Sequence, residues 1–247
     1  MKKPTVYIVS NLGGGVRKST SIAHLVFALQ ERNQDPIIVA LDTNATLESL
    51  LPDGTDIMKW DLNNETESHE GLRAVLTKSA QSGRPAVLDL AALGGDSFGI
   101  KTLLRTKMLD MCEVVSVVPI LPSQKSIVEA SKALALVQPD KWFLVQYGTK
   151  NSQRIYDDLM EFKQLKEMSP DAIIRPSELT DAEAQSLQKE DSVLNKMGEV
   201  TAVNPFGTFH LQIFVGYWSE LSRQYNEVLD IINLDQDDSK RPEKTTA

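Results

Sequence analysis

The 247-residue sequence has few of the residues from which disulfide frameworks and metal centres are built. It contains one cysteine, Cys112, which excludes an internal disulfide, and the apolar neighbours of Cys112 predict a small core residue. Its three histidines, His24, His69 and His210, are scattered without the short spacing that metal ligands show. We therefore expect neither a disulfide scaffold nor a histidine metal site, and we assign these histidines no role.

The sequence also lacks long apolar runs and an excess of positive charge. No run approaches the roughly 20 residues of a membrane-spanning helix, and the first four residues, M-K-K-P, lead directly into a predicted strand rather than a signal peptide. These features predict a cytoplasmic protein. The net charge of −8 argues against a protein that constitutively binds specific nucleic-acid sequences, because lysine and arginine supply most of the affinity for nucleic acids. The net charge does not exclude local basic patches on the surface.

Short apolar runs alternate with amphipathic segments along the chain. This alternation predicts an α/β fold with a doubly wound, mostly parallel sheet, helices on both faces, and ligands at the carboxyl ends of the strands. We expect a single domain over residues 1–234, a surface excursion at 53–70 and a disordered tail at 235–247. The predicted strands are residues 5–10, 36–41, 85–90, 113–118, 142–147 and 172–174. The first predicted helix follows the glycine-rich segment after the first strand, and the others span residues 71–82, 97–111, 123–137, 152–168 and 209–234.

The segment after the first strand carries the strongest chemical signal. Residues 11–20 read N-L-G-G-G-V-R-K-S-T, a glycine-rich turn that ends in Lys-Ser at the start of a helix. Such a turn directs several backbone N–H groups at one point, where a polyphosphate can bind. Lys18 is expected to reach the terminal phosphates, and the Ser19 hydroxyl to bind Mg²⁺. The other predicted ligand contacts in the turn are Gly13, Gly14, Gly15, Val16, Arg17 and Thr20.

Two residues depart from the standard phosphate-loop pattern, G-x-x-x-x-G-K-[ST]. Leu12 stands in place of the first glycine and Arg17 in place of the glycine before the lysine. A side chain at position 17 is expected to cost about 1–3 kcal/mol in strain, since glycine is used where a loop backbone bends unusually. A glycine-rich turn that only caps a helix is therefore the alternative interpretation of these ten residues.

Two aspartates follow later strands of the predicted sheet. Asp89 lies in the run 85–90, where a nucleotide-binding sheet places the carboxylate that holds Mg²⁺, usually through water. Asp42 closes the second strand, where a carboxylate can orient the water that attacks a γ-phosphate. Asp42 can also cap the helix that begins near Ala45 or Thr46, and the two roles do not exclude each other.

Taken together, these segments resemble the ParA/MinD family of deviant Walker A ATPases, P-loop NTPases of the SIMIBI-like type that position plasmids, chromosomes and other cargo. Residues 9–20 are similar to the family loop V-A-N-x-K-G-G-V-G-K-[ST]-T, and residues 41–46 to the segment L-D-P-Q-G-N-A-T. Residues 117–122 resemble its I-P-V-x-P run, and residues 174–184 its I-P-x-x-x-x-x-x-E-A segment. The resemblance runs in the same order from about residue 4 to about residue 230.

The resemblance implies a role for each matching residue. Asp42 falls on the hydrolytic aspartate of the family, Asp89 on its Walker B aspartate, and Pro176 in its nucleotide-binding segment after the last strand. It further implies ATP and Mg²⁺ as cofactors and an ATP-dependent homodimer. Slow hydrolysis would then partition DNA or position another cargo with an adaptor or cargo protein, in the cytoplasm or at the nucleoid.

The departures from the family fall on its diagnostic residues. Gly13 occupies the position of the signature lysine, which in the family reaches the partner's ATP, and Ala40 replaces the first aspartate of D-x-D. Some cargo-positioning relatives lack that lysine. Because of these losses and of Arg17, the alternative function is a pseudo-ATPase binding module for plasmid maintenance or conjugation, with weak or no nucleotide binding. Arg17 is interpreted either as a cation near the phosphates or as a solvent-facing side chain. A metabolic enzyme of the same superfold is disfavoured, because no further substrate site is visible.

The C-terminal half of the sequence bears on possible partners. The terminal helix has one apolar face and an exposed side with Glu220, Glu227 and Asp230, which anionic lipid repels, so we expect a core helix rather than a membrane helix. The apolar face comprises Phe214, Trp218, Leu221, Tyr225, Val228 and Ile232. The resemblance also implies nonspecific DNA binding. Its candidate residues alternate with acidic ones, so a solvated face is the alternative; they are Lys150, Arg154, Lys163, Lys166 and Arg175.

Overall fold

A single parallel sheet organises the protein. The computed structural model describes residues 3–41, 47, 50–51, 54–60, 64–90, 108–148, 152–176 and 208–234. Each pair of neighbouring strands in these residues is parallel, and the spatial order is β3-β2-β4-β1-β5-β6-β7, which confirms the predicted α/β class. The strands are β1 (Thr5–Val9), β2 (Ile37–Leu41), β3 (Ile57–Lys59), β4 (Ala86–Leu90), β5 (Glu113–Ile120), β6 (Lys141–Gln146) and β7 (Ala172–Ile174).

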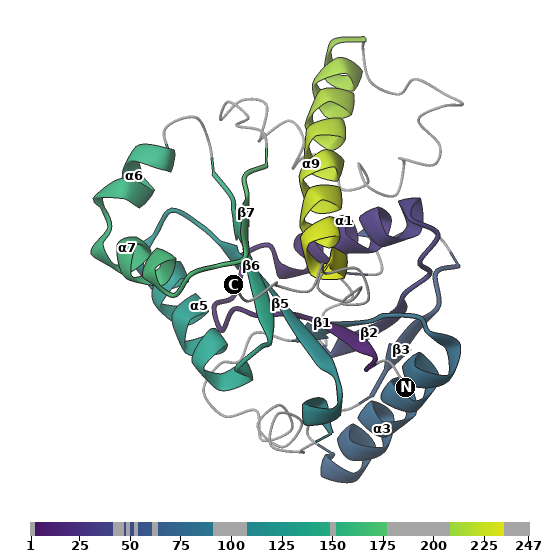
Figure 1. Ribbon diagram of the computed structural model, residues 1–247. Helices are drawn as coiled ribbons and strands as arrows, with labels where there is room; N and C mark the ends of the chain where they lie inside the picture. The colour runs from purple at the N-terminus through teal and green to yellow at the C-terminus, as the bar shows by residue number, and fades with distance from the viewer. Residues whose placement is uncertain are drawn as a thin grey trace, which may run out of the picture.

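Helices cover both faces of the sheet, as predicted. Helices α1 and α9 pack on one face, and α3, α5, α6 and α7 on the other (Figure 1). The helices are α1 (Lys18–Glu31), α3 (Glu65–Ser82), α5 (Gln124–Val137), α6 (Ser152–Asp158), α7 (Met160–Glu167) and α9 (Thr208–Leu234), with a 3₁₀ turn η1 at Leu109–Met111.

The strands are apolar on both sides because both faces are covered. In β1, Tyr7 and Val9 face the core under α1 and α9, whereas Val6 and Ile8 face the core under α3. This arrangement explains why the strand reads as a continuous apolar run rather than as an alternating one. Burial of each such aliphatic side chain contributes about 1.5–3 kcal/mol, so the central strands are fixed firmly in the middle of the protein.

The chain order creates a switch point at β1. From β1 the chain passes to β2 and β3 on one side, returns to β4 beside β1, and then continues to β5 on the other side. At the end of β1, Val9 is paired with Asp89 in β4 and with Val117 in β5. The carboxyl ends of these three strands therefore lie close together, where open α/β sheets bind ligands.

The terminal helix is a core helix, as predicted. The side chains of Leu221, Tyr225, Val228 and Ile232 are buried against α1 and the sheet, while Glu227 and Asp230 are exposed. Arg32 at the end of α1 donates to the Asn226 Oδ1 over 2.6 Å and pairs with Asp230 over 2.7 Å. The side chains of Phe214 and Trp218 lie outside the described part. Among the described residues, no helix is both long and apolar enough to cross a membrane.

The structure differs from the sequence prediction between residues 53 and 70. Strand β3 lies in this predicted surface excursion, and its three residues at the sheet edge are too few and too exposed to give a clear apolar pattern. Helix α3 begins at Glu65 instead of residue 71. Asn64 caps it by accepting from the Glu67 N–H over 3.3 Å, and the Asn64 amide donates to the Glu67 carboxylate over 2.9 Å.

The predicted helix at 152–168 is divided at Leu159, whose backbone is extended. Tyr156 and Phe162 are both buried in one cluster with ring centroids 4.9 Å apart. On a continuous helix these two side chains would point about 120° apart, so the break turns both toward the core. Of the predicted helix 97–111, the described residues contain only the turn η1, and the predicted tail 235–247 lies outside them.

The predicted role of Cys112 is confirmed. The side chain is 2% exposed and packs in the core between the sheet and α3. Burial raises the pKa of its thiol to about 11. Cys112 is therefore an unreactive packing residue at neutral pH.

Candidate functional site

The glycine-rich segment leaves the sheet at its centre. Residues 10–17 connect the end of β1 to the start of α1, directly beside the carboxyl end of β4. The first N–H groups of a helix have no partner within the helix, and together with the helix dipole they attract anions. The start of α1 therefore presents an anion-binding group of N–H donors at the switch point.

Asn11 ties the base of this loop to the neighbouring strand. Its side chain is buried, and its Nδ2 donates to the carbonyl oxygens of Pro119, over 2.8 Å, and Ser126, over 3.1 Å. Its Oδ1 accepts from the Gly13 N–H over 2.8 Å. We did not predict this role, although an asparagine directly after a strand and before glycines is a readable turn signal. Three hydrogen bonds thus fix where the loop starts.

Lys18 lies under the loop rather than extended into solvent. The residue is 8% exposed, and its Nζ donates to the Gly13 carbonyl over 2.6 Å. At the crest, Gly14 and Gly15 are exposed and an added Cβ would meet no atom within 4 Å, while Gly15 has a φ of 69° that favours glycine. The loop therefore wraps around the lysine amine and keeps an open outer side.

Ser19 and Asp89 form the second polar pair of the site. The Ser19 hydroxyl donates to the Asp89 Oδ2 over 3.1 Å, and Asp89 is 1% exposed at the end of β4. A hydroxyl and a carboxylate are oxygen ligands of the kind that Mg²⁺ prefers, with waters and phosphate oxygens completing its shell. No group of three or more metal-binding His, Cys, Asp or Glu side chains occurs in the described part of the chain. The residues present thus fit an ion that a phosphate ligand helps to hold.

The Arg17 side chain lies against an aromatic ring, and its role as a cation near the phosphates stays a prediction. Arg17 is partly buried, and its guanidinium carbon lies over the Tyr147 ring, 5.3 Å from the ring centroid. Its backbone is left-handed, with φ 62° and ψ 35°. The solvent-facing interpretation is therefore wrong, because the cation is engaged by an aromatic ring inside the protein.

A buried polar network continues from Tyr147 into α1. The Ser21 hydroxyl is 3.0 Å from the Tyr147 hydroxyl, and the His24 Nδ1 is 3.4 Å from it. Burial, and secondarily the positive charge of Arg17, lower the pKa of His24 to about 3. We assigned His24 no role from the sequence. In the structure it is a neutral imidazole at neutral pH and packs beside Tyr217 and Tyr225.

The remaining predicted site residues are placed as follows. Val16 is buried beside Gly13, and Thr20 is partly exposed in the first turn of α1. Pro176 is buried after β7 and lines a small pocket with Tyr147 and Arg175. The prediction for Asp42 falls on a residue outside the described ones. The structure thus brings Lys18, Ser19 and Asp89 together, with Pro176 beside the ring that Arg17 contacts.

Position 13, where the resembling family carries its lysine, is packed closely. A Cβ on Gly13 would lie 3.1 Å from the Asn11 Oδ1 and 3.2 Å from the Val16 Cγ1. These contacts are tighter than ordinary van der Waals distances, so a side chain at this position would require the loop to shift slightly.

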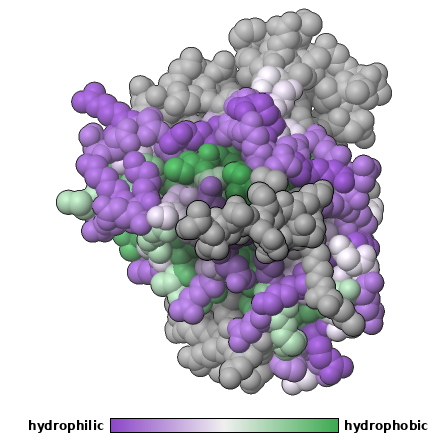
Figure 2. All heavy atoms as spheres, viewed as in Figure 1, coloured by the Kyte–Doolittle hydropathy of each residue, from purple (hydrophilic) through white to green (hydrophobic). Residues whose placement is uncertain are grey.

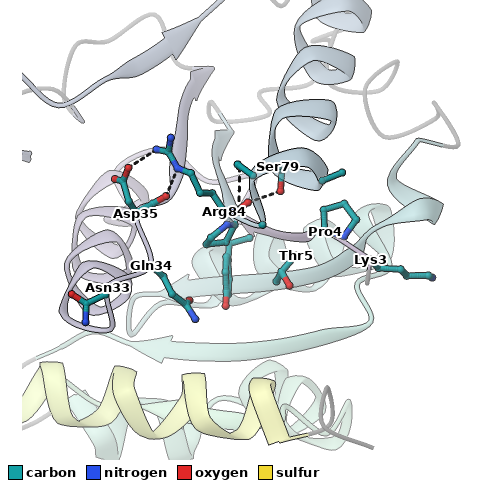
Figure 3. A pocket seen from close by; sticks show the side chains of 13 residues that line it. Lys3, Pro4, Thr5, Asn33, Gln34, Asp35, Ser79 and Arg84 are labelled. Atoms are coloured by element: carbon teal, nitrogen blue, oxygen red, sulfur yellow. Dashed lines mark hydrogen bonds and ion pairs between the residues drawn. The ribbon is translucent and has the colours of Figure 1, made fainter. Parts of the chain in front are cut away.

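A larger pocket lies at the opposite, amino edge of the sheet. It has a volume of about 400 Å³ and is bordered by the start of β1, the turn after α1 and the segment after α3. Figure 3 shows Arg84 turned toward Asp35, to which it is bound over 2.7 Å. None of the predicted site residues borders this pocket.

The candidate DNA-binding residues lie on a mixed surface. Arg154, Lys163, Lys166 and Arg175 are exposed, and Lys150 lies outside the described residues. Asp157, Asp158 and Glu167 are exposed among them, and the side of the molecule where α6 and α7 lie is largely hydrophilic (Figure 2). Their arrangement favours no continuous positive groove.

Comparisons with known proteins identify the fold. No protein-family profile matches the chain, and no curated protein matches its sequence. Many solved structures resemble it, among them the following three. The matched chain of the MinC:MinD cell division protein complex from Aquifex aeolicus has 13% identity and a TM-score of 0.55, with 92% of this chain and 95% of that chain covered. Apo McdA from Cyanthece also has 13% identity and a TM-score of 0.55, covering 92% and 99%. A ParA family ATPase from Chlorobium tepidum TLS has 17% identity and a TM-score of 0.53, covering 92% and 98%. The chain therefore has the fold of the MinD, McdA and ParA proteins.

Proposed function

We propose that this protein is a ParA-like ATPase with a deviant Walker A loop, which binds Mg²⁺ and ATP and uses slow hydrolysis to partition or position a cargo. The observation that carries the proposal is the convergence of Lys18, Ser19 and Asp89 beside an open glycine-rich loop at the start of α1. A buried lysine and a hydroxyl at a helix start, with a buried carboxylate on the neighbouring strand, are groups that P-loop enzymes use in phosphoryl transfer.

Each side chain has a defined task in this proposal. The Lys18 amine moves from the Gly13 carbonyl to the terminal phosphates, and the loop N–H groups hold the same phosphates. Ser19 and Asp89 are the residues that would hold Mg²⁺, Ser19 through its hydroxyl and Asp89 through a water. Asp42 is proposed to orient the attacking water, which it does by position rather than by covalent chemistry. A bound Mg²⁺ would neutralise the charge that develops on the phosphate oxygens.

Nucleotide titration tests the proposal. With a fluorescent ATP analogue and Mg²⁺, the wild type should bind saturably, and Lys18→Ala should bind at least about 30-fold more weakly, because a charged hydrogen bond contributes about 2 kcal/mol. Lys132→Ala is the matched control, because Lys132 is exposed on α5 and pairs with Glu129 over 2.8 Å. The control should bind like the wild type.

The rival function, a pseudo-ATPase binding module, gives a different result. A wild type that shows no saturable binding at millimolar nucleotide would contradict the ATPase proposal and favour this module. Its motivation is the glycine at position 13, where the packed loop leaves little space for a lysine. Mass photometry with and without ATP then tests the proposed ATP-dependent homodimer, and an unchanged monomer mass at saturating ATP would contradict the dimer.

The proposed partners are a second copy of the chain and an adaptor or cargo protein, and nonspecific DNA is included from the family resemblance. The exposed residues Arg154, Lys163, Lys166 and Arg175 are the proposed DNA contacts. Their simultaneous replacement by alanine should abolish retention on nonspecific duplex DNA at low salt, because each lost phosphate contact reduces the salt-dependent affinity. Retention that survives this replacement would exclude this surface.

A further inference from the structure

We propose that Arg17 is a positioning residue that holds the phosphate loop in its binding conformation by stacking on Tyr147. The inference rests on the proposed function, since it concerns the same loop, but it assigns the arginine a task that differs from contact with the phosphates. It also explains how a loop can carry arginine at a position where the standard pattern has glycine.

The contacts around Arg17 form a closed ring. Its guanidinium carbon is 5.3 Å from the centroid of the Tyr147 ring. The Ser21 hydroxyl donates to the Arg17 carbonyl over 3.0 Å, and it is 3.0 Å from the Tyr147 hydroxyl. Because the hydrogen of Ser21 is used on the carbonyl, the Tyr147 hydroxyl is the donor to Ser21. Arg17 is thus held at its backbone and at its side chain by the same tyrosine and serine.

Tyr147 is a rigid support for this ring. Its side chain is 2% exposed, and its N–H donates to the Ile120 carbonyl over 3.0 Å. The Tyr156 hydroxyl donates to the Tyr147 carbonyl over 2.6 Å. The aromatic face is therefore fixed to the ends of β5 and β6 and to α6, so a cation stacked on it is fixed to the body of the protein.

The backbone of Arg17 needs such support. A residue with a side chain rarely adopts a φ of 62°, and it persists there only where its surroundings hold it. A planar guanidinium can stack on an aromatic face, which a lysine ammonium does less well. The stack therefore stabilises the same left-handed turn that glycine would adopt without help.

Nucleotide affinity separates the backbone from the side chain. Arg17→Ala keeps a Cβ in the left-handed region and loses the stack, so it should bind the fluorescent ATP analogue about tenfold more weakly. Arg17→Gly also loses the stack but adopts this φ freely, so it should stay within about threefold of the wild type. Equal losses in both variants would overturn the proposal and indicate direct contact of the guanidinium with the ligand.

A measurement without nucleotide keeps this test independent of the proposed function. Hydrogen exchange of the amides of residues 13–19 in the ligand-free protein should become about tenfold faster in Arg17→Ala and in Tyr147→Leu than in the wild type. The double variant should exchange no faster than either single variant, because both changes remove the same contact. If the wild type fails to bind nucleotide and this pattern still holds, the positioning role survives while the ATPase proposal fails.

Tyr147→Phe covers the case in which Tyr147→Leu does not fold. It keeps the aromatic face and removes the hydroxyl, so Arg17→Ala should still accelerate exchange about tenfold in the phenylalanine background. Unchanged exchange in Arg17→Ala, in either the wild-type or the phenylalanine background, would overturn the positioning role.

Discussion

At the carboxyl edge of the sheet, Lys18 and Asp89 are almost completely buried. Lys18 donates to the Gly13 carbonyl in the loop, and Asp89 accepts from the Ser19 hydroxyl at the start of α1. At the amino edge, the side chains of Arg84 and Asp35 pair over 2.7 Å while 34% and 72% exposed. A pocket of about 400 Å³ lies at this second edge, and its Arg84 and Asp35 side chains neutralise each other's charge while both are partly in water. The first edge keeps polar groups out of water and beside an open loop, where electrostatic interactions are strong.

This difference concerns how charged side chains are held at the two edges of the sheet. A buried charged group is costly unless a ligand, an ion or the protein compensates it, whereas an exposed pair contributes little to stability and needs no ligand. If the comparison is correct, substitutions at the carboxyl edge should affect both folding and binding. Substitutions at the amino edge should affect folding slightly and binding not at all.

The largest effect is expected at Asn11, which fixes the base of the loop. Asn11→Ala leaves the buried Gly13 N–H and the Pro119 and Ser126 carbonyls without this partner, so the free energy of unfolding should fall by about 3 kcal/mol in urea denaturation. Asn64→Ala is the control, since it removes an exposed helix cap that contributes about 1 kcal/mol. A similar loss in both variants would remove the distinction between the loop base and an ordinary surface site.

The next effect depends on pH and concerns His24. Its pKa is about 3 in the folded protein, because of burial and then Arg17, against about 6.5 when unfolded. Below pH 6.5 the unfolded chain takes up a proton that the folded protein refuses, so stability is complete above 6.5 and is lost as pH falls toward 3, by about 1.4 kcal/mol per unit.

His24→Gln should therefore lose less stability than the wild type between pH 7 and pH 4.5, with a difference of about 2.7 kcal/mol in thermal or urea unfolding. His69→Gln is the control, because His69 is exposed on α3. Parallel pH profiles for His24→Gln and the wild type would show that water reaches the network under the loop, which would weaken the contrast between the two edges.

Much of the fold could be predicted from the sequence, because parallel strands buried on both faces leave strong apolar runs. The central strands and the long helices α1, α5 and α9 depend on such patterns. Strand β3 could not be predicted, since three half-exposed residues at an edge leave no period to detect. The early start of α3 has a local signal, because Asn64 and Glu67 have the spacing of a helix N-terminal cap.

The candidate site divides in the same way. The proximity of Lys18, Ser19 and Asp89 could be predicted, because these residues belong to local sequence motifs at the ends of strands. The partner of Arg17 could not, because Tyr147 is 130 residues away in the sequence and carries no motif. A stacking contact depends on how β6 lies against α1, which local patterns do not encode. Sequence reasoning therefore finds the proposed phosphate-binding and metal-binding residues more readily than the residues proposed to hold them in place.

The smallest effect is expected at Arg84, on the amino edge. Arg84 donates to the Asp35 carbonyl over 2.6 Å and to the Pro36 carbonyl over 3.3 Å, in addition to its ion pair with Asp35. Because these groups are partly solvated, Arg84→Ala should lower the free energy of unfolding by about 1 kcal/mol, with Arg154→Ala, on exposed α6, as a control near zero. Affinity for the fluorescent ATP analogue should stay within about twofold of the wild type, since water refills the larger pocket while the loop at the other edge is untouched. An affinity loss as large as that of Lys18→Ala would place the ligand at the amino edge and reverse the comparison.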